Sequence, residues 1–224
     1  MAKSKILIQL VNNEISLDVA LKRLMLICND LNYNEIYEWA EKELNGYNDD
    51  DKVPEYRNLG NGIIVYSGLK GNSLSHLKFT NQPMPIHWIP SELQQIILNN
   101  YERSPVMSIV DKSKSNKDFS KDLTALSSLI KVGIAFTSIT QKFDSFTFGE
   151  IANKISNVLF KIFMKLDSEY GNLDSLDLDI SKKEKQEIIY IEKVLLSYVN
   201  ELKCIKIGDN NEIKDSNIGE SNEN

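Results

Sequence analysis

The sequence predicts an α+β protein with an N-terminal helical layer, a small central antiparallel sheet and a C-terminal antiparallel helix pair. Apolar residues recur at helical spacing over the first 45 residues, and β-prone runs bounded by turn residues follow from residue 62. Helical spacing then returns between residues 146 and 205. Helices and strands that are segregated along a chain are typical of the α+β class.

The helical layer begins with a short apolar stripe over residues 6–11. Ser16 is placed to cap a second helix, because its hydroxyl can accept a hydrogen bond from a free backbone amide, and Asn34 is placed to cap a third. Gly46 follows the third helix, where glycine commonly supplies a left-handed residue that ends a helix. We therefore expect three short helices in succession.

Two β-prone runs, residues 62–67 and 74–80, are joined by a glycine-bearing link and predict a hairpin. Pro90 and Ser104-Pro105 each suit the start of a following helix. Apolar and other residues alternate over residues 130–136, which predicts a third strand.

Residues 111–122 form a polar stretch rich in Ser and Lys that we interpret as a mobile link or an internal boundary. This gives an N-terminal region of helices and hairpin over residues 1–110 and a mostly helical region over residues 123–206. Whether the two form one compact unit is left open. The tail over residues 207–224 holds five acids against one lysine, and we expect it to be disordered.

The C-terminal helix pair is predicted from two Ser/Thr-x-x-Glu patterns. Thr147 and Glu150 fit a capping box, and Phe146 is placed to pack on Ile151 as a hydrophobic staple. A second box over residues 181–184 opens the last helix, and its apolar spacing suits antiparallel packing on the first.

Composition indicates a cytoplasmic protein. The formal net charge is −6 and the pI is about 5.1, which argues against wrapping of nucleic acid. We find neither a signal peptide nor an apolar stretch long enough to span a membrane. The two cysteines, Cys28 and Cys204, fall on predicted apolar helix faces, so we interpret them as buried hydrophobic residues.

A family resemblance lies in two short segments. Residues 43–47 read Glu-Leu-Asn-Gly-Tyr, and residues 53–57 read Val-Pro-Glu-Tyr-Arg after an acidic bend. Together with Trp39 and the helix start at Ser16, these segments resemble the AbiTii family. The resemblance implies a role in bacterial abortive infection, in which an infected cell stops growing or dies before phage progeny are released. It also implies a co-encoded second protein as partner, with a phage-derived molecule as a candidate trigger.

The same segments supply the candidate binding residues, which are Asn45, Gly46, Tyr47, Tyr56 and Arg57. Arg57 leads this set, since a guanidinium fork suits carboxylate or phosphate recognition. A structural interpretation stands beside it: Gly46 ends a helix, the tyrosines pack, and Arg57 pairs with Glu43 or Asp51.

Other chemistries have less support in the sequence. Lys112, Lys114 and Lys117 could make a weak, salt-sensitive nucleic-acid contact, although lysines in a Ser-rich loop are usually solvated. The two histidines, His76 and His87, lack zinc-ligand spacing, and the acids at residues 49–51 lack the calcium-loop pattern. We therefore predict neither a metal nor a cofactor.

These observations predict a component of an abortive-infection system that acts through protein contacts, without an evident catalytic site. Two alternatives remain. One is an effector enzyme that acts on RNA or nucleotides through a site assembled from distant residues, and the other is an antitoxin-like regulator of a co-encoded toxin. The sequence indicates no membrane partner and leaves open whether the chain forms a homo-oligomer.

Overall fold

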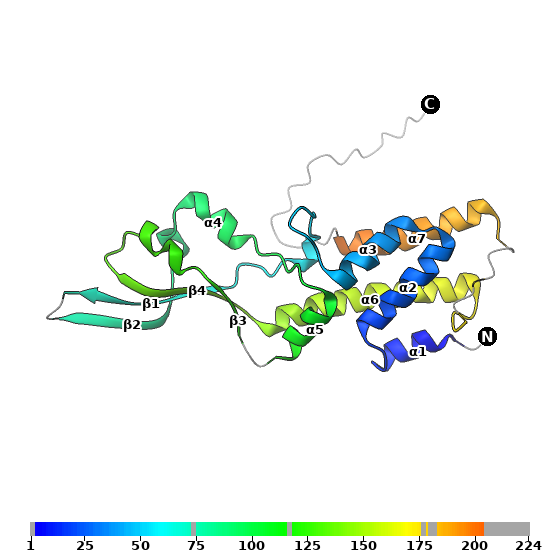
Figure 1. Ribbon diagram of the computed structural model, residues 1–224, viewed down its shortest axis with the longest axis horizontal. Helices are drawn as coiled ribbons and strands as arrows, with labels where there is room; N and C mark the ends of the chain where they lie inside the picture. Colours follow the sequence, from blue (N-terminus) through cyan, green and yellow to red (C-terminus); the bar gives the residue numbers. More distant parts are fainter. Residues whose placement is uncertain (1–2, 73–74, 116–117, 176–177, 179–182, 204–224) are drawn as a thin grey trace, which may run out of the picture.

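The computed structural model describes residues 3–72, 75–115, 118–175, 178 and 183–203, and it confirms the α+β class. Figure 1 shows an elongated molecule with most helices gathered at one end and a four-stranded sheet with α4 at the other. Two buried apolar clusters follow this division, a larger one among the helices and a smaller one against the sheet.

The N-terminal helical layer is confirmed and consists of α1 (Lys5–Val11), α2 (Leu17–Leu31) and α3 (Asn34–Asn45). Ser16 occupies the N-cap position of α2, but its side chain makes no capping hydrogen bond. Asn34 is the first residue of α3, and the cap position falls on Tyr33. The chain reverses between α2 and α3 at Asn32, whose φ of 58° lies in the left-handed region that asparagine tolerates.

The remaining helices of this end are α5 (Val106–Lys114), α6 (Ser145–Tyr170) and α7 (Lys185–Lys203). Figure 1 shows α6 and α7 lying side by side in opposite directions, which confirms the predicted antiparallel pair. Their apolar faces join those of α2 and α3 in the larger cluster. Within the described residues, no helix has both the length and the apolar character that a membrane crossing requires.

The capping box predicted at Thr147 and Glu150 is wrong. Helix α6 begins three residues earlier, because the carboxylate of Asp144 accepts the backbone N–H of Phe146 at 2.8 Å and caps the helix. The predicted staple also fails, since Phe146 is 70% exposed. The second box falls on residues 181–184, of which 181 and 182 lie outside the described residues.

The sheet contains β1 (Ile63–Gly71), β2 (His76–Pro83), β3 (Phe119–Asp122) and β4 (Ala135–Phe143). The strands are antiparallel in the order β2-β1-β4-β3. The predicted hairpin is therefore confirmed as β1 and β2. Central strand β1 also pairs with β4, for example Tyr66 with Ile139, so residues from both sides of the predicted link share one sheet.

Two sequence-based predictions in this part, the start of the third strand and a free link, are wrong. The strand predicted over residues 130–136 starts at Ala135, and Ile130, Val132 and Ile134 instead pack on the sheet's apolar cluster from the preceding loop. The polar stretch 111–122 is not a free link where it is described, because α5 continues to Lys114 and β3 begins at Phe119. Residues 116–117 lie outside the described residues.

One face of the sheet is covered by α4 (Ser91–Leu98) and by the short 3-10 turns η2 (Ile86–Trp88) and η3 (Thr124–Leu129). Tyr66 lies at the centre of that face, with the rings of Phe79, Trp88 and Phe136 between 5.5 and 5.8 Å from its own. Aromatic contacts at such distances add to the stabilisation from burial. The chain between α3 and β1 contains a third turn, η1 (Glu55–Arg57), which carries the candidate site.

Cys28 is buried on α2, as the sequence predicts, and Cys204 lies outside the described residues. Burial, together with the nearby charge of Glu192, raises the pKa of the Cys28 thiol and keeps it protonated. In a Cys204→Ser variant at pH 8, we expect a maleimide to react with native Cys28 at least about tenfold more slowly than with the unfolded chain. Equal rates in the native and unfolded protein would show that the thiol is accessible.

Candidate functional site

A buried ion pair joins the two segments that the sequence singled out. Glu43 on α3 and Arg57 on η1 are both fully buried. The Nη2 atom of Arg57 donates to Oε2 of Glu43 at 2.7 Å, and its Nε donates to Oε1 at 3.3 Å. This two-pronged contact is the geometry in which an arginine–carboxylate pair is strongest. The sequence leaves Glu43 and Asp51 open as partners of Arg57. In the structure Arg57 pairs with Glu43, whereas Asp51 binds Lys42.

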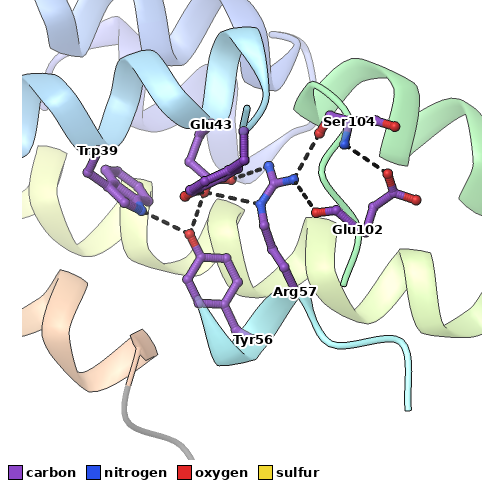
Figure 2. Close-up of polar contacts among 7 residues, drawn as sticks. Trp39, Glu43, Tyr56, Arg57, Glu102 and Ser104 are labelled. Carbon is purple, nitrogen blue, oxygen red and sulfur yellow. Dashed lines mark hydrogen bonds and ion pairs between the residues drawn. The ribbon is translucent and has the colours of Figure 1, made fainter. Parts of the chain in front are cut away.

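Two tyrosines and a tryptophan complete the cluster. Tyr47 and Tyr56 both donate their hydroxyl hydrogens to Oε1 of Glu43, the former at 2.7 Å. The Nε1 atom of Trp39 donates to the Tyr56 hydroxyl at 3.0 Å, as Figure 2 shows. The guanidinium of Arg57 also lies 4.7 Å from the centre of the Tyr47 ring, a cation–π contact. The Glu43 carboxylate is therefore surrounded by donors.

Arg57 also ties a third segment into the cluster. Its Nη1 atom donates to the backbone carbonyls of Glu102 at 2.9 Å and Ser104 at 2.8 Å, in the connection between α4 and α5 (Figure 2). The backbones of the two connections also bond to each other, with the N–H of Glu102 donating to the carbonyl of Arg57 at 2.8 Å. The cluster thus lies between the helices and the sheet, and it holds the α3–β1 and α4–α5 connections together.

The electrostatics of the cluster favour a charged arginine and neutral tyrosines. Burial, and next the charge of Glu43, raise the pKa of Tyr47 and of Tyr56 above the ordinary value. Burial alone would lower the pKa of Arg57, but the charge and hydrogen bonds of Glu43 outweigh it and raise that pKa. All three groups therefore keep their protons over the physiological pH range.

The five candidate binding residues differ in their access to solvent. Asn45, the last residue of α3, is exposed, whereas Gly46 is half-buried and Tyr47, Tyr56 and Arg57 are buried. Gly46 has a φ of +90°, and a side chain there would meet the carbonyl oxygen of Arg103 at 2.7 Å. In this arrangement the guanidinium faces protein groups, and a binding role for the set stays a prediction.

The three candidate lysines do not form one patch among the described residues. The Nζ atom of Lys112 binds the buried carboxylate of Glu102 at 2.6 Å and lies 5.3 Å from the centre of the Phe148 ring. Lys114 is exposed at the end of α5, and Lys117 lies outside the described residues. Lys112 therefore extends the buried cluster to α5 and α6.

The ion pair between Lys112 and Glu102 predicts a dependence of stability on pH. Burial would raise the pKa of Glu102, but hydrogen bonds from Lys112 and Ser104 outweigh it and hold the pKa below the ordinary 4.5. Since the folded pKa is the lower one, the stabilisation is present above pH 4.5 and is lost as the pH falls through the folded value. We expect Glu102→Gln to lower the free energy of unfolding by about 1–2 kcal/mol at pH 7. Urea titrations from pH 7 to pH 3 should show that difference shrinking; a constant difference would contradict this account.

A groove of about 1010 Å³ lies on the helical end, between the loop that joins α1 to α2, helix α5 and the first half of α6. A second hollow of about 410 Å³ shares Leu10, Asn13, Asn153, Ser156 and Asn157 with it. The apolar residues that line the two are Leu10, Val11, Ile15, Leu17, Met107, Val110, Phe146, Ala152 and Phe160. The sequence pattern does not indicate this groove, because its walls come from three separate parts of the chain.

Metal ligands are not grouped in the described residues, where no set of three or more His, Cys, Asp or Glu side chains could hold an ion.

The fold and the cluster define an α+β protein built in two packed parts, a helical end and a four-stranded antiparallel sheet. A buried glutamate–arginine pair lies between the two parts. Within that class, the family model for AbiTii matches residues 4–190 of this chain. The chain therefore belongs to the AbiTii family, as the resemblance over residues 43–57 indicated, and this makes it a bacterial abortive-infection defence protein. No curated protein and no solved structure matches it.

Proposed function

We propose that this protein acts in abortive infection by binding another protein in the cytoplasm, with the product of a co-encoded gene as its partner. A phage-derived molecule is the proposed trigger. The observation that carries the proposal is the groove between the α1–α2 loop, α5 and α6, together with the apolar side chains at its ends.

Two large apolar side chains at this groove are exposed to solvent. Phe146, at the start of α6, is 70% exposed, and Val11, at the end of α1, is 63% exposed. Among the other apolar residues of the lining, Ile15, Leu17, Met107, Val110 and Phe160 are partly exposed. Single exposed apolar residues are ordinary, but several around one concave surface are typical of a protein-binding site.

The polar lining of the groove also supports a polypeptide as its ligand. Glu14 and Glu150 are matched by Lys114 and Lys154, so the charges of the lining cancel. A nucleic acid needs a basic surface, because its phosphates supply most of the binding energy through cations. Amide side chains such as Asn153 both donate and accept hydrogen bonds, which suits the polar side chains of a protein partner.

Phage plating on cells that carry the gene with and without its neighbour tests the proposal. We expect plating efficiency to fall when both genes are present, and the two products to co-purify. Phe146→Ser should abolish this protection, while Met164→Ser should preserve it; Met164 is an exposed apolar residue on the same helix, outside the groove. Unchanged plating across a broad phage panel, with both genes expressed, would overturn the proposal.

A further inference from the structure

Gly149 occupies a position in α6 that neither the backbone nor the packing of this chain requires to be glycine. It is the fifth residue of a 26-residue helix, and glycine inside a helix is less stable than alanine by roughly 1 kcal/mol. Its φ is not positive. A Cβ atom added there would meet only the Cβ of Ser113, at 3.7 Å, which is an ordinary contact. Alanine would therefore fit the free protein and stabilise it.

Gly149 lines the groove. On one side of α6, the lining continues from Phe146 through Gly149 and Asn153 to Ser156 and Phe160, at spacings of three and four residues. At a rise of 1.5 Å per residue this stripe is about 21 Å long, the length of a helix of about 14 residues. The middle of the stripe has small side chains, so a ligand can approach the α6 backbone most closely at Gly149.

The walls of the groove have no free strand edge. They are formed by α5, α6 and the α1–α2 loop, and the N–H groups of Asn12, Asn13 and Glu14 in that loop already donate to carbonyls of α1. Addition of an extended peptide to a sheet needs unpaired backbone groups, whereas a helix enters a groove with its side chains alone. The groove therefore suits a helix.

We infer that the groove receives an amphipathic α-helix of the partner protein, which crosses α6 with a small side chain on Gly149 and apolar side chains against Phe146 and Val110. This inference rests on the proposed function and specifies the partner's chemistry. The acidic segment 208–224 of this chain, with five acids and one lysine, does not fit a lining whose charges cancel. A second copy of the chain is distinguished by the experiment below.

Substitution of Gly149 by alanine distinguishes an effect on binding from an effect on folding. We expect the thermal stability to rise and the affinity for the partner to fall. Gly149→Ala should raise the Tm of the free protein by about 2–4 °C, the shift expected for roughly 1 kcal/mol in a chain of this size. The same variant should weaken binding of the purified neighbouring gene product several-fold, and Gly149→Leu should weaken it at least tenfold. Ser168→Leu, at an exposed position on the same helix outside the groove, is the matched control and should bind normally.

Photo-crosslinking locates the bound segment. With benzoylphenylalanine at position 146 and the neighbouring gene product co-expressed, we expect a crosslink to a helical segment of that product, and none from position 164. A crosslink from position 146 to a second copy of this chain would overturn the inference. So would normal binding by Gly149→Leu, and in that case the proposed function stands with a different contact surface. Absence of any binding to the neighbouring product would overturn both.

Discussion

Replacing Glu43 with alanine should lower the free energy of unfolding by about 3–5 kcal/mol, because it leaves the buried guanidinium of Arg57 without its counter-charge. The change also removes the acceptor of the Tyr47 and Tyr56 hydroxyls. Both partners of the pair are fully buried, so water cannot replace the lost carboxylate without opening the core. Denaturant titration at pH 7 measures the loss.

Two variants give this prediction its controls. Asp18→Ala breaks the exposed pair with Lys22 on α2, and exposed pairs contribute at most about 1 kcal/mol. The double variant Glu43→Leu, Arg57→Met replaces the pair with apolar groups and should recover part of the stability lost in Glu43→Ala. If Glu43→Ala unfolds no more easily than Asp18→Ala, the pair is not the buried, desolvated contact described here.

Replacing Gly46 with alanine should lower the free energy of unfolding by more than about 2 kcal/mol. Gly46 ends α3 with φ +90° and ψ 177°, a conformation that is nearly confined to glycine and costs other residues about 1–3 kcal/mol. A Cβ atom there would also lie 2.7 Å from the backbone oxygen of Arg103, far inside van der Waals contact. Because that oxygen accepts the N–H of Tyr47 at 2.9 Å, it cannot move away without breaking this bond.

Gly60 provides the comparison for Gly46. It also has a positive φ, of +70°, but no atom lies within 4 Å of an added Cβ. Gly60→Ala should therefore show the backbone effect alone and be the milder change of the two, by thermal unfolding followed with circular dichroism. Equal losses of stability in the two variants would mean that the close approach of the α4–α5 connection to Gly46 does not contribute to the destabilisation by Gly46→Ala.

The helical parts of the fold follow from local patterns, and for that reason the sequence predicts them. The spacing of Leu21, Leu24, Cys28 and Leu31 places one apolar side on α2, and these residues are all buried. Gly46 and Pro105 lie at the helix boundaries that their backbone preferences indicate. The β1–β2 hairpin is likewise local, since only residues 72–75 separate its two paired strands.

Strands β3 and β4 depend on contacts that are distant in sequence, and the sequence pattern is misleading there. The side chain of Gln141 is fully buried in β4, where it donates to the carbonyls of Asn61 and Ile97. A polar residue at a buried position interrupts the alternation that reveals a strand. The regular alternation of Ile130, Val132 and Ile134 belongs to a loop that packs on the sheet's apolar cluster.

For the candidate site, the sequence indicates the residues but not their surroundings. The sequence limits the partner of Arg57 to Glu43 or Asp51 but does not decide between them. The deciding feature is burial, which excludes water from the Glu43 pair and cannot be recognised from the order of the residues. The groove was missed for a related reason: Phe146 was interpreted as one half of a staple, whereas it is exposed at the groove. A glycine at position 149 within a strongly helical pattern is the one local signal that could have indicated it.

Within this chain the buried cluster contributes to stability, whereas the groove is the proposed binding site. Changes at Glu43 or Gly46 should reduce the amount of folded protein, whereas changes at Phe146 or Gly149 should leave the folded protein intact and weaken partner binding. Loss of phage protection in the first group can follow from unfolding alone. Only the second group reports on the proposed contact surface, provided that the Tm of each variant is measured alongside.

Titration calorimetry of the purified chain with the purified product of the neighbouring gene tests the central claim, which is recognition of another protein, most directly. We predict saturable binding by the unchanged chain and by Met164→Ser, with a negative heat-capacity change from burial of apolar surface. Phe146→Ser should bind much more weakly at an unchanged Tm. The absence of binding heat across the accessible temperatures, from two proteins that together protect cells against phage, would contradict the claim.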